Sequence, residues 1–201
     1  MKLYWCPQTR SLRALWMAEE TGVPYERVHI NIRGPSSQAD AAFRAASPMG
    51  KVPALEDGAV RIWDSGAICG YLADQYPARG LAPAIGHPDR GAYLMWLMFT
   101  NAVIEPAMTE KAAGAAPNPL RNGWGSYEQM LATLRQGIER GPWILGERFS
   151  AADVLLGMSC HFMRQFKMIA DEPLLFAYAD RCAARPAFQR ALAIEAGAAG
   201  A

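Results

Sequence analysis

The sequence has no excess of charge of either sign, no long apolar run and no paired cysteines. Its 20 Lys and Arg residues against 19 Asp and Glu give a net charge of +1, so nothing in the charge points to a nucleic-acid partner. No apolar run approaches the roughly 18 residues that a membrane-spanning helix needs. The N-terminus shows no secretory signal, and four cysteines without paired spacing suit a reducing compartment. We therefore expect a cytoplasmic protein without a membrane partner.

Metal-ligand spacing is also missing. The three histidines, His29, His87 and His161, do not pair with one another or with a cysteine at the intervals typical of a metal site. We therefore expect no metal. What the chain does have is hydrophobic residues, at 51% of its 201 positions, enough for one large domain or two small ones.

The first 76 residues alternate between strand and helix patterns. Lys2–Trp5 predicts a buried strand, and Leu12, Leu15 and Trp16 lie at helical spacing. Val28, Ile30 and Ile32 alternate with polar residues, which predicts a half-buried strand. The segment 39–46 predicts a short helix.

A hairpin and a further helix follow. Asp57-Gly58 between two apolar runs, 52–56 and 60–63, predicts a two-residue turn in which both positions have positive φ. Ile68 and its neighbours begin the helix. The order β-α-β-α-β-β-α predicts a mixed sheet with helices on its faces.

Beyond residue 77 the pattern changes. Residues 78–88, rich in Pro, Gly and Ala, predict a linker, and every later periodic segment is helical, with Pro106 expected to kink the first long helix. The sequence thus predicts an α/β domain over 1–77 and an all-α domain over 89–201.

Three motifs in the first domain carry the chemistry. In the first, Pro53 begins a strand, and a cis Val52–Pro53 bond would turn the main chain of Val52 outward to pair with an extended peptide; a plain strand start is the alternative. In the second, Ser65 begins a helix as N-cap, where an anion can bind; ordinary capping is the alternative. In the third, Thr9 and Ser11 precede the first helix, again as caps or as functional hydroxyls.

A fourth motif lies in the helical half. Ser150 and Asp153 have the spacing of a capping box, with Phe149 and Val154 as a hydrophobic staple. We expect a structural role for it, the start of a buried helix.

Together these motifs resemble the cytosolic glutathione S-transferase family. The segments Ser-Pro-x-Gly-Lys-Val-Pro at 47–53 and Asp-Ser-x-Ala-Ile at 64–68 are the most specific, and the opening turn looks like that of bacterial and fungal members that use a hydroxyl or a main-chain N–H. The resemblance covers nearly the whole chain. It implies a thioredoxin-like N-terminal domain followed by an all-helical C-terminal domain.

The resemblance also implies the roles of individual residues. The glutathione-binding set would be Lys51, Val52, Pro53, Asp64 and Ser65. The catalytic candidates that stabilise the thiolate are Thr9, Ser11 and Arg10, with Thr9 preferred because it aligns best with the family's serine before the first helix.

The second substrate would be a small hydrophobic electrophile or a peroxide, and the family implies a homodimeric detoxification enzyme without a cofactor other than glutathione as cosubstrate. The residues expected to line the pocket for the second substrate are Trp96, Phe99, Thr100, Met108 and Phe162. Three further functions remain open: a glutathione-dependent peroxidase or disulfide reductase, a non-enzymatic binding protein, and a glutaredoxin-type thiol transferase that depends on Cys6.

Overall fold

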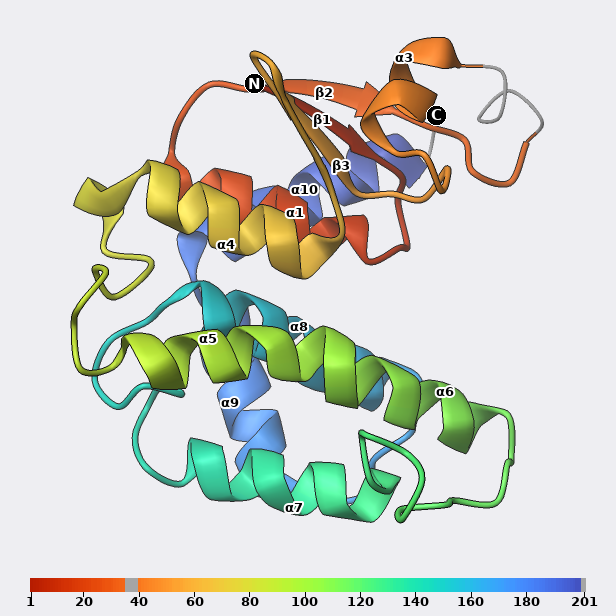
Figure 1. Ribbon diagram of the computed structural model, residues 1–201, viewed down its shortest axis with the longest axis vertical. Helices are drawn as coiled ribbons and strands as arrows, with labels where there is room; N and C mark the ends of the chain where they lie inside the picture. The colour runs from red at the N-terminus through yellow and green to blue at the C-terminus, as the bar shows by residue number, and fades with distance from the viewer. Residues whose placement is uncertain (35–39, 200–201) are drawn as a thin grey trace. The chain divides into compact units, whose positions relative to one another are not determined.

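The computed structural model describes residues 1–34 and 40–199 (Figure 1). By its contacts the chain divides into two compact units, Met1–Arg79 with Ala184–Ala201, and Gly80–Ala183. The first break falls within the predicted linker, after a short 3-10 helix over Pro77–Arg79. No helix among the described residues is long and apolar enough to cross a membrane.

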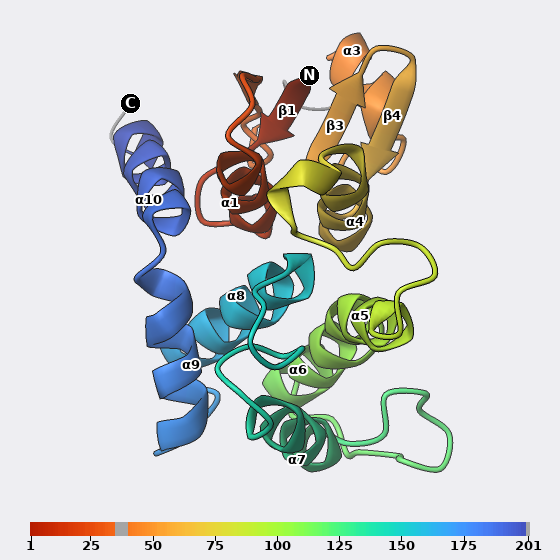
Figure 2. The same cartoon turned by 90° about the vertical axis from the view of Figure 1, so that its left-hand side faces the viewer.

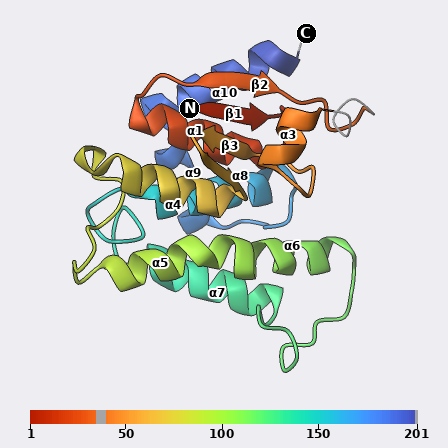
Figure 3. The ribbon, with the colours of Figure 1, turned by 45° about the horizontal axis from the view of Figure 1, so that its top comes forward.

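The first unit is built on a four-stranded mixed sheet in the order β2-β1-β3-β4. β1 pairs with β2 in parallel and with β3 antiparallel, and β3 pairs antiparallel with β4; β2, β1 and β3 lie side by side in Figure 3. The strands are β1 (Lys2–Trp5), β2 (Glu26–His29), β3 (Ala54–Asp57) and β4 (Val60–Trp63). The predicted order of strands and helices is confirmed.

Helices cover the sheet because successive side chains of a strand point to opposite faces. Tyr4 and Ala54 share a core cluster with Phe43 of α3 (Ala41–Ala46), and the rings of Tyr4 and Phe43 lie 5.7 Å apart. The alternate positions, Leu3 and Leu55, are fully buried as well. Helices α1 (Ser11–Thr21) and α4 (Ser65–Gln75) contact each other and the sheet strands. Of the predicted helix 39–46, residue 39 lies outside the described residues.

Two details of the predicted strands are wrong. The hairpin turn is Gly58-Ala59 and not Asp57-Gly58, because Asp57 pairs with Val60 as the last residue of β3. Of the two residues predicted to have positive φ, only Gly58 does, at 59°. Glycine at the first turn position is the arrangement that matches the twist of the strands. The second strand ends at His29, and Ile32 is 37% exposed, so the apolar alternation runs past the last residue that pairs with β1.

The last helix, α10 (Pro186–Ala199), packs on α1 in the first unit (Figure 2). Arg185, just before it, donates two hydrogen bonds to Glu20, at 2.6 and 2.8 Å. Phe188 meets the buried ring of Trp16 edge-on at 4.9 Å. The sequence analysis assigned these residues to the helical domain, since helical periodicity alone does not say which surface an amphipathic helix covers.

The second unit is all-helical. α8 lies at its centre, with every residue from 151 to 160 buried. Five residues between α5 and α6 form a π-helical turn, Thr100–Ile104, and Pro106 follows in the first turn of α6. The kink expected at Pro106 stays a prediction. The helices are α5 (Arg90–Phe99), α6 (Glu105–Ala112), α7 (Tyr127–Ile138), α8 (Ala151–Gln165) and α9 (Pro173–Ala183).

The start of α8 is held by Asp153, which is fully buried. One carboxylate oxygen accepts hydrogen bonds from the N–H of Ile144 at 2.8 Å and the hydroxyl of Tyr178 at 2.7 Å. The other accepts from the N–H of Ser150 at 2.9 Å, which completes the predicted capping box. Burial raises the pKa of Asp153, and these donors act in the opposite direction. The predicted structural role is therefore confirmed.

Replacing Asp153 with Ala leaves four buried donors without an acceptor: the N–H groups of Ile144 and Ser150 and the hydroxyls of Ser150 and Tyr178. At about 1–3 kcal/mol each, we expect the free energy of unfolding to fall by roughly 3 kcal/mol or more. Asp153→Asn keeps one acceptor oxygen and should lose less. Urea unfolding of the two variants checks this order, and an alanine variant as stable as the asparagine variant would contradict it.

Candidate glutathione site

Sheet topology brings three loops of the first unit to one edge. Because β3 runs antiparallel to both neighbours, the C-terminal ends of β1 and β4 and the N-terminal end of β3 meet there. The register fixes this, since Tyr4 pairs with Ala54 and Ala54 pairs with Trp63. Strands lie about 4.8 Å apart, so the outer two of these three loops begin roughly 10 Å from each other. An extended tripeptide has about that length.

In the loop before β3 the bond between Val52 and Pro53 is cis, which is one of the two alternatives that the sequence left open. Ser47, fully buried, shapes this loop: its hydroxyl accepts from the N–H of Lys51 at 3.0 Å and donates to the C=O of Lys51 at 2.8 Å. Gly50 has a φ of 64°, which lets the chain turn. Within residues 1–34 and 40–199, the N–H and C=O of Val52 have no protein partner.

The loop after β4 begins helix α4, and here the expected cap is off by one residue. Asp64 is the N-cap, with φ at 83°, and its carboxylate accepts from the N–H groups of Gly66 at 2.9 Å and Ala67 at 3.1 Å. Ser65 is the first helical residue and is 5% exposed. Carboxylates cap as well as hydroxyls, so Asp64 takes the cap and leaves the Ser65 N–H without a partner among the described residues.

The loop after β1 holds a compact network around the main chain of Cys6. The Ser11 hydroxyl accepts from the N–H of Cys6 at 3.1 Å and lies 2.8 Å from its C=O. The Thr9 hydroxyl lies 2.7 Å from the same C=O and 2.7 Å from the Ser11 hydroxyl, and it accepts from the Ser11 N–H at 3.1 Å. Two hydroxyl hydrogens thus serve three oxygen–oxygen contacts.

The two hydroxyls differ in access. Ser11 is fully buried, whereas Thr9 is half-buried. Arg10, half-buried as well, is the N-cap residue of α1 without a side-chain cap hydrogen bond. A ligand at this edge therefore reaches Thr9 before Ser11, and the burial of Ser11 fits a supporting role.

Comparison with known proteins agrees with this geometry. The family model "Glutathione S-transferase, N-terminal domain" matches residues 5–75. A solved structure of a sphingomonad glutathione S-transferase in complex with glutathione is 32% identical, with a TM-score of 0.79, and the match covers 98% of this chain and 99% of that one. The chain belongs to the glutathione S-transferase family.

Two curated relatives show the range of this family. The glutathione S-transferase GstA of Escherichia coli O157:H7 is 26% identical over 199 residues, which is 97% of this chain and 98% of that protein. The disulfide-bond oxidoreductase YfcG of Escherichia coli (strain K12) is 26% identical over 204 residues, 94% of this chain and 93% of that protein.

Other thiol and phenol groups of the chain are poor candidates for thiol activation. The Tyr4 hydroxyl donates to Glu56 at 3.0 Å, and burial raises the pKa of Tyr4 to about 12. Burial likewise raises the pKa of the Cys69 thiol, and that of Cys160 to about 12. Cys6 is only 2% exposed.

The residues predicted to line the second-substrate pocket all belong to the helical unit. Trp96 and Phe99 meet edge-on at 5.1 Å, and only Phe99 of the set is half-buried rather than buried. Thr100 is fully buried in the π-helical turn, and its hydroxyl has no partner among the described residues. Met108 and Phe162 are 3% and 6% exposed. Their predicted role stays a prediction.

Metal-binding groups do not gather in the part of the chain that the structure describes: no three His, Cys, Asp or Glu side chains there could hold a metal ion.

The sequence analysis missed two residues that shape the loops of the site, Ser47 and Glu195. Ser47 could have been found, since a small polar residue four positions before Lys51 suits a turn. The contact of Gln8 with Glu195, across 187 positions, leaves no local signal.

Replacing Ser11 with Ala removes the acceptor of the buried Cys6 N–H. An unsatisfied buried donor costs about 1–3 kcal/mol, and we expect the free energy of unfolding to fall by that amount. Thr9→Ala should cost less, because water can reach the half-buried position. Chemical denaturation of both variants measures the difference, and an equal or larger loss in Thr9→Ala would refute the supporting role of Ser11.

Proposed function

We propose that this protein is a glutathione transferase that binds glutathione at the three-loop edge of the sheet, stabilises its thiolate and adds it to a small hydrophobic electrophile. The observation that carries this proposal is the convergence of the loops after β1, before β3 and after β4. Each offers a different kind of group: hydroxyls, unpaired main-chain groups and a helix N-terminus.

Glutathione fits these groups end to end. The main chain of Val52 pairs with the cysteinyl residue as a short added strand would, with Pro53 behind it. Asp64 and Ser65 hold the γ-glutamyl end, since a helix N-terminus binds a carboxylate and the Asp64 carboxylate suits its ammonium. Lys51 is exposed beside Val52 and reaches the glycine carboxylate.

Thr9 is the proposed thiol donor. A free thiol of this kind titrates at about 8.5, and a hydrogen bond to a charged group contributes about 1.5–3 kcal/mol, against roughly 1 kcal/mol for the neutral hydrogen bond that Thr9 gives up. The difference lowers the thiol pKa by roughly one unit, at 1.36 kcal/mol per unit. Arg10 adds a positive charge at the start of α1, where the helix dipole acts in the same direction.

The second substrate is proposed to contact the helical unit through Trp96, Phe99, Thr100, Met108 and Phe162. The Thr100 hydroxyl supports this, because a buried hydroxyl without a protein partner is suited to a ligand or a water molecule. The likeness to the oxidoreductase YfcG favours a second candidate, a glutathione-dependent disulfide reductase or peroxidase at the same site.

A thiol transferase and an inactive binding protein are less well supported. A thiol transferase that acts through Cys6 needs an accessible thiol, and Cys6 is buried. A bare scaffold that no longer bound glutathione would not need Lys51, Val52, Asp64 and Ser65 together, and a protein that bound glutathione without activating it would leave the thiol pKa unshifted.

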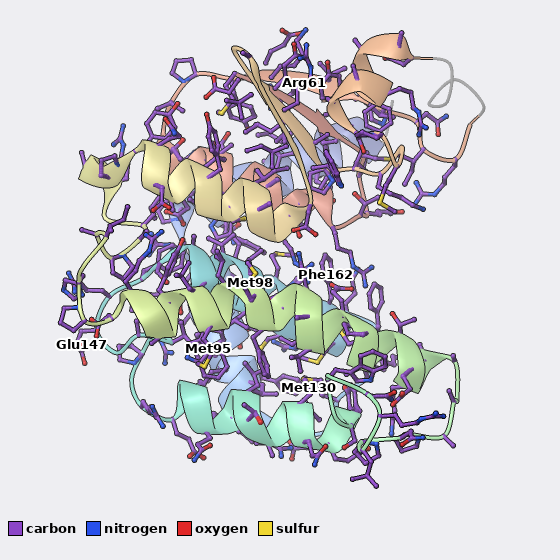
Figure 4. All side chains as sticks on the ribbon, viewed as in Figure 1. Arg61, Met95, Met98, Met130, Glu147 and Phe162 are labelled. Carbon is purple, nitrogen blue, oxygen red and sulfur yellow. The ribbon has the colours of Figure 1, made fainter. Side chains whose placement is uncertain are left out.

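We also propose a homodimer. Three apolar side chains of α5, Leu94, Met95 and Met98, are 43%, 53% and 49% exposed; Figure 4 labels Met95 and Met98. On β4, Val60 and Trp63 are 40% and 42% exposed. Exposed apolar patches are typical of interaction surfaces. In the family one subunit's N-terminal domain faces the other's helical domain, which would cover both patches.

The functional test is calorimetry of glutathione binding, with ultraviolet absorbance of the thiolate across pH. Thr9→Ala should bind glutathione with a thiol pKa roughly one unit higher, because the charged form loses a donor. Thr133→Ala, which removes an exposed threonine hydroxyl on α7, is the matched control. An unchanged pKa would exclude Thr9 as donor, and absence of binding by the unaltered protein would refute the function.

The dimer is tested by light scattering at micromolar concentration, where we expect about twice the chain mass of 21.9 kDa. Met98→Glu should shift the mass toward that of one chain, since it buries a charge in the proposed interface. Leu120→Glu, at a loop residue that is 98% exposed, should leave it unchanged. A single-chain mass for the unaltered protein would refute the dimer.

A further inference from the structure

A carboxylate from the far end of the chain contacts the loop that carries Thr9. Glu195, on α10, accepts a hydrogen bond from the main-chain N–H of Gln8 at 2.8 Å. Gln8 directly precedes Thr9 and is itself exposed. Its φ is 57°, in the left-handed region that is unfavourable for a residue with a side chain. The hydrogen bond from Gln8 to Glu195 offsets part of that cost.

Helix α10 is held to α1 by two arginines that precede Glu195 in the chain. Arg190 donates to the carboxylate of Glu19 at 2.7 Å and to its C=O at 2.9 Å. Arg185 forms the two-point pair with Glu20, whose side chain is 7% exposed. These pairs hold α10 against α1, the helix that follows the Thr9 loop (Figure 2). The loop is therefore connected to α10 both through α1 and through the hydrogen bond to Glu195.

We propose that Glu195 is a positioning residue for thiol activation: it holds Gln8 in its left-handed conformation and thereby sets the direction of the neighbouring Thr9 hydroxyl. This inference rests on the proposed function. Glu195 does not touch the thiol, and it acts through the main chain of the loop.

The thiol pKa of bound glutathione distinguishes this positioning role from a direct effect of the Glu195 charge. If Glu195 acted only as a nearby negative charge, its removal would favour the thiolate and lower the thiol pKa. If it positions Thr9, its removal weakens the hydrogen bond to the thiolate and raises the thiol pKa. The two explanations thus predict shifts of opposite sign.

The experiment uses the full chain and four variants. Glu195→Ala removes the acceptor, and Glu195→Gln keeps an acceptor oxygen without the charge. Gln8→Asn in the Glu195→Ala background places at position 8 a residue that tolerates the left-handed region. Glu147→Ala, at an exposed residue of the helical unit (Figure 4), is the matched control.

Two readouts are expected to change together. Amide hydrogen exchange in a peptide that covers residues 6–11, measured without ligand, should be faster in Glu195→Ala than in the unaltered protein. The thiol pKa of bound glutathione should rise by roughly half a unit to one unit. Glu195→Gln and the Gln8→Asn double variant should both lie closer to the unaltered protein, and Glu147→Ala should match it.

Each other outcome overturns a distinct statement. Unchanged exchange in Glu195→Ala means that Glu195 does not hold the loop. Faster exchange with an unchanged or lowered thiol pKa means that the loop is held but that Thr9 is not positioned through it. Absence of glutathione binding by the unaltered protein refutes the proposed function and the positioning role with it, whereas binding with an unaltered pKa in Glu195→Ala refutes the role of Glu195 alone.

Discussion

The antiparallel pairing of β3 with both of its neighbours is the constraint on which the rest of the site depends. Reversing the direction of the chain at β3 brings the end of β1, the start of β3 and the end of β4 to one edge. A wholly parallel sheet would also gather loops at one edge, but each would lead out of a strand. Here the loop before β3 leads into a strand, and it supplies unpaired main-chain groups. The loops after β1 and β4 supply the hydroxyls and the helix N-terminus.

Two of these loops are shaped in the same way. Ser11 accepts from the N–H and lies beside the C=O of Cys6, and Ser47 does both for Lys51. In each case a fully buried hydroxyl satisfies both main-chain groups of one residue. Burying these groups without a partner would be costly, so each serine allows an irregular loop to pack closely. Thr9 and Val52, on the same two loops, are the residues to which the proposed function assigns contact with the ligand.

Sequence patterns predicted the order of the elements and the three loops well, because period and turn residues are local properties. They failed where neighbouring residues compete for one role. Asp57-Gly58 and Gly58-Ala59 are both plausible turns, and the pairing of Asp57 with Val60 decides between them. Ser65 and Asp64 are both good caps, and only the backbone geometry selects Asp64. Distant contacts could not be predicted for another reason. Nothing in the sequence around α10 shows that Arg185 and Arg190 pair with Glu20 and Glu19, and the hydrogen bond from Gln8 to Glu195 follows from that placement.

The helical unit is an insertion, since the chain leaves the first unit after Arg79 and returns to it at Ala184. During synthesis the strands and α1 emerge before the helical unit, but the helix that covers Trp16 emerges only after it. Until α10 has been made, the first unit therefore carries an uncovered apolar surface, and Glu19 and Glu20 lack their arginine partners. A ribosome that stalls within the helical unit would leave this domain unfinished, however much of the sheet had already formed.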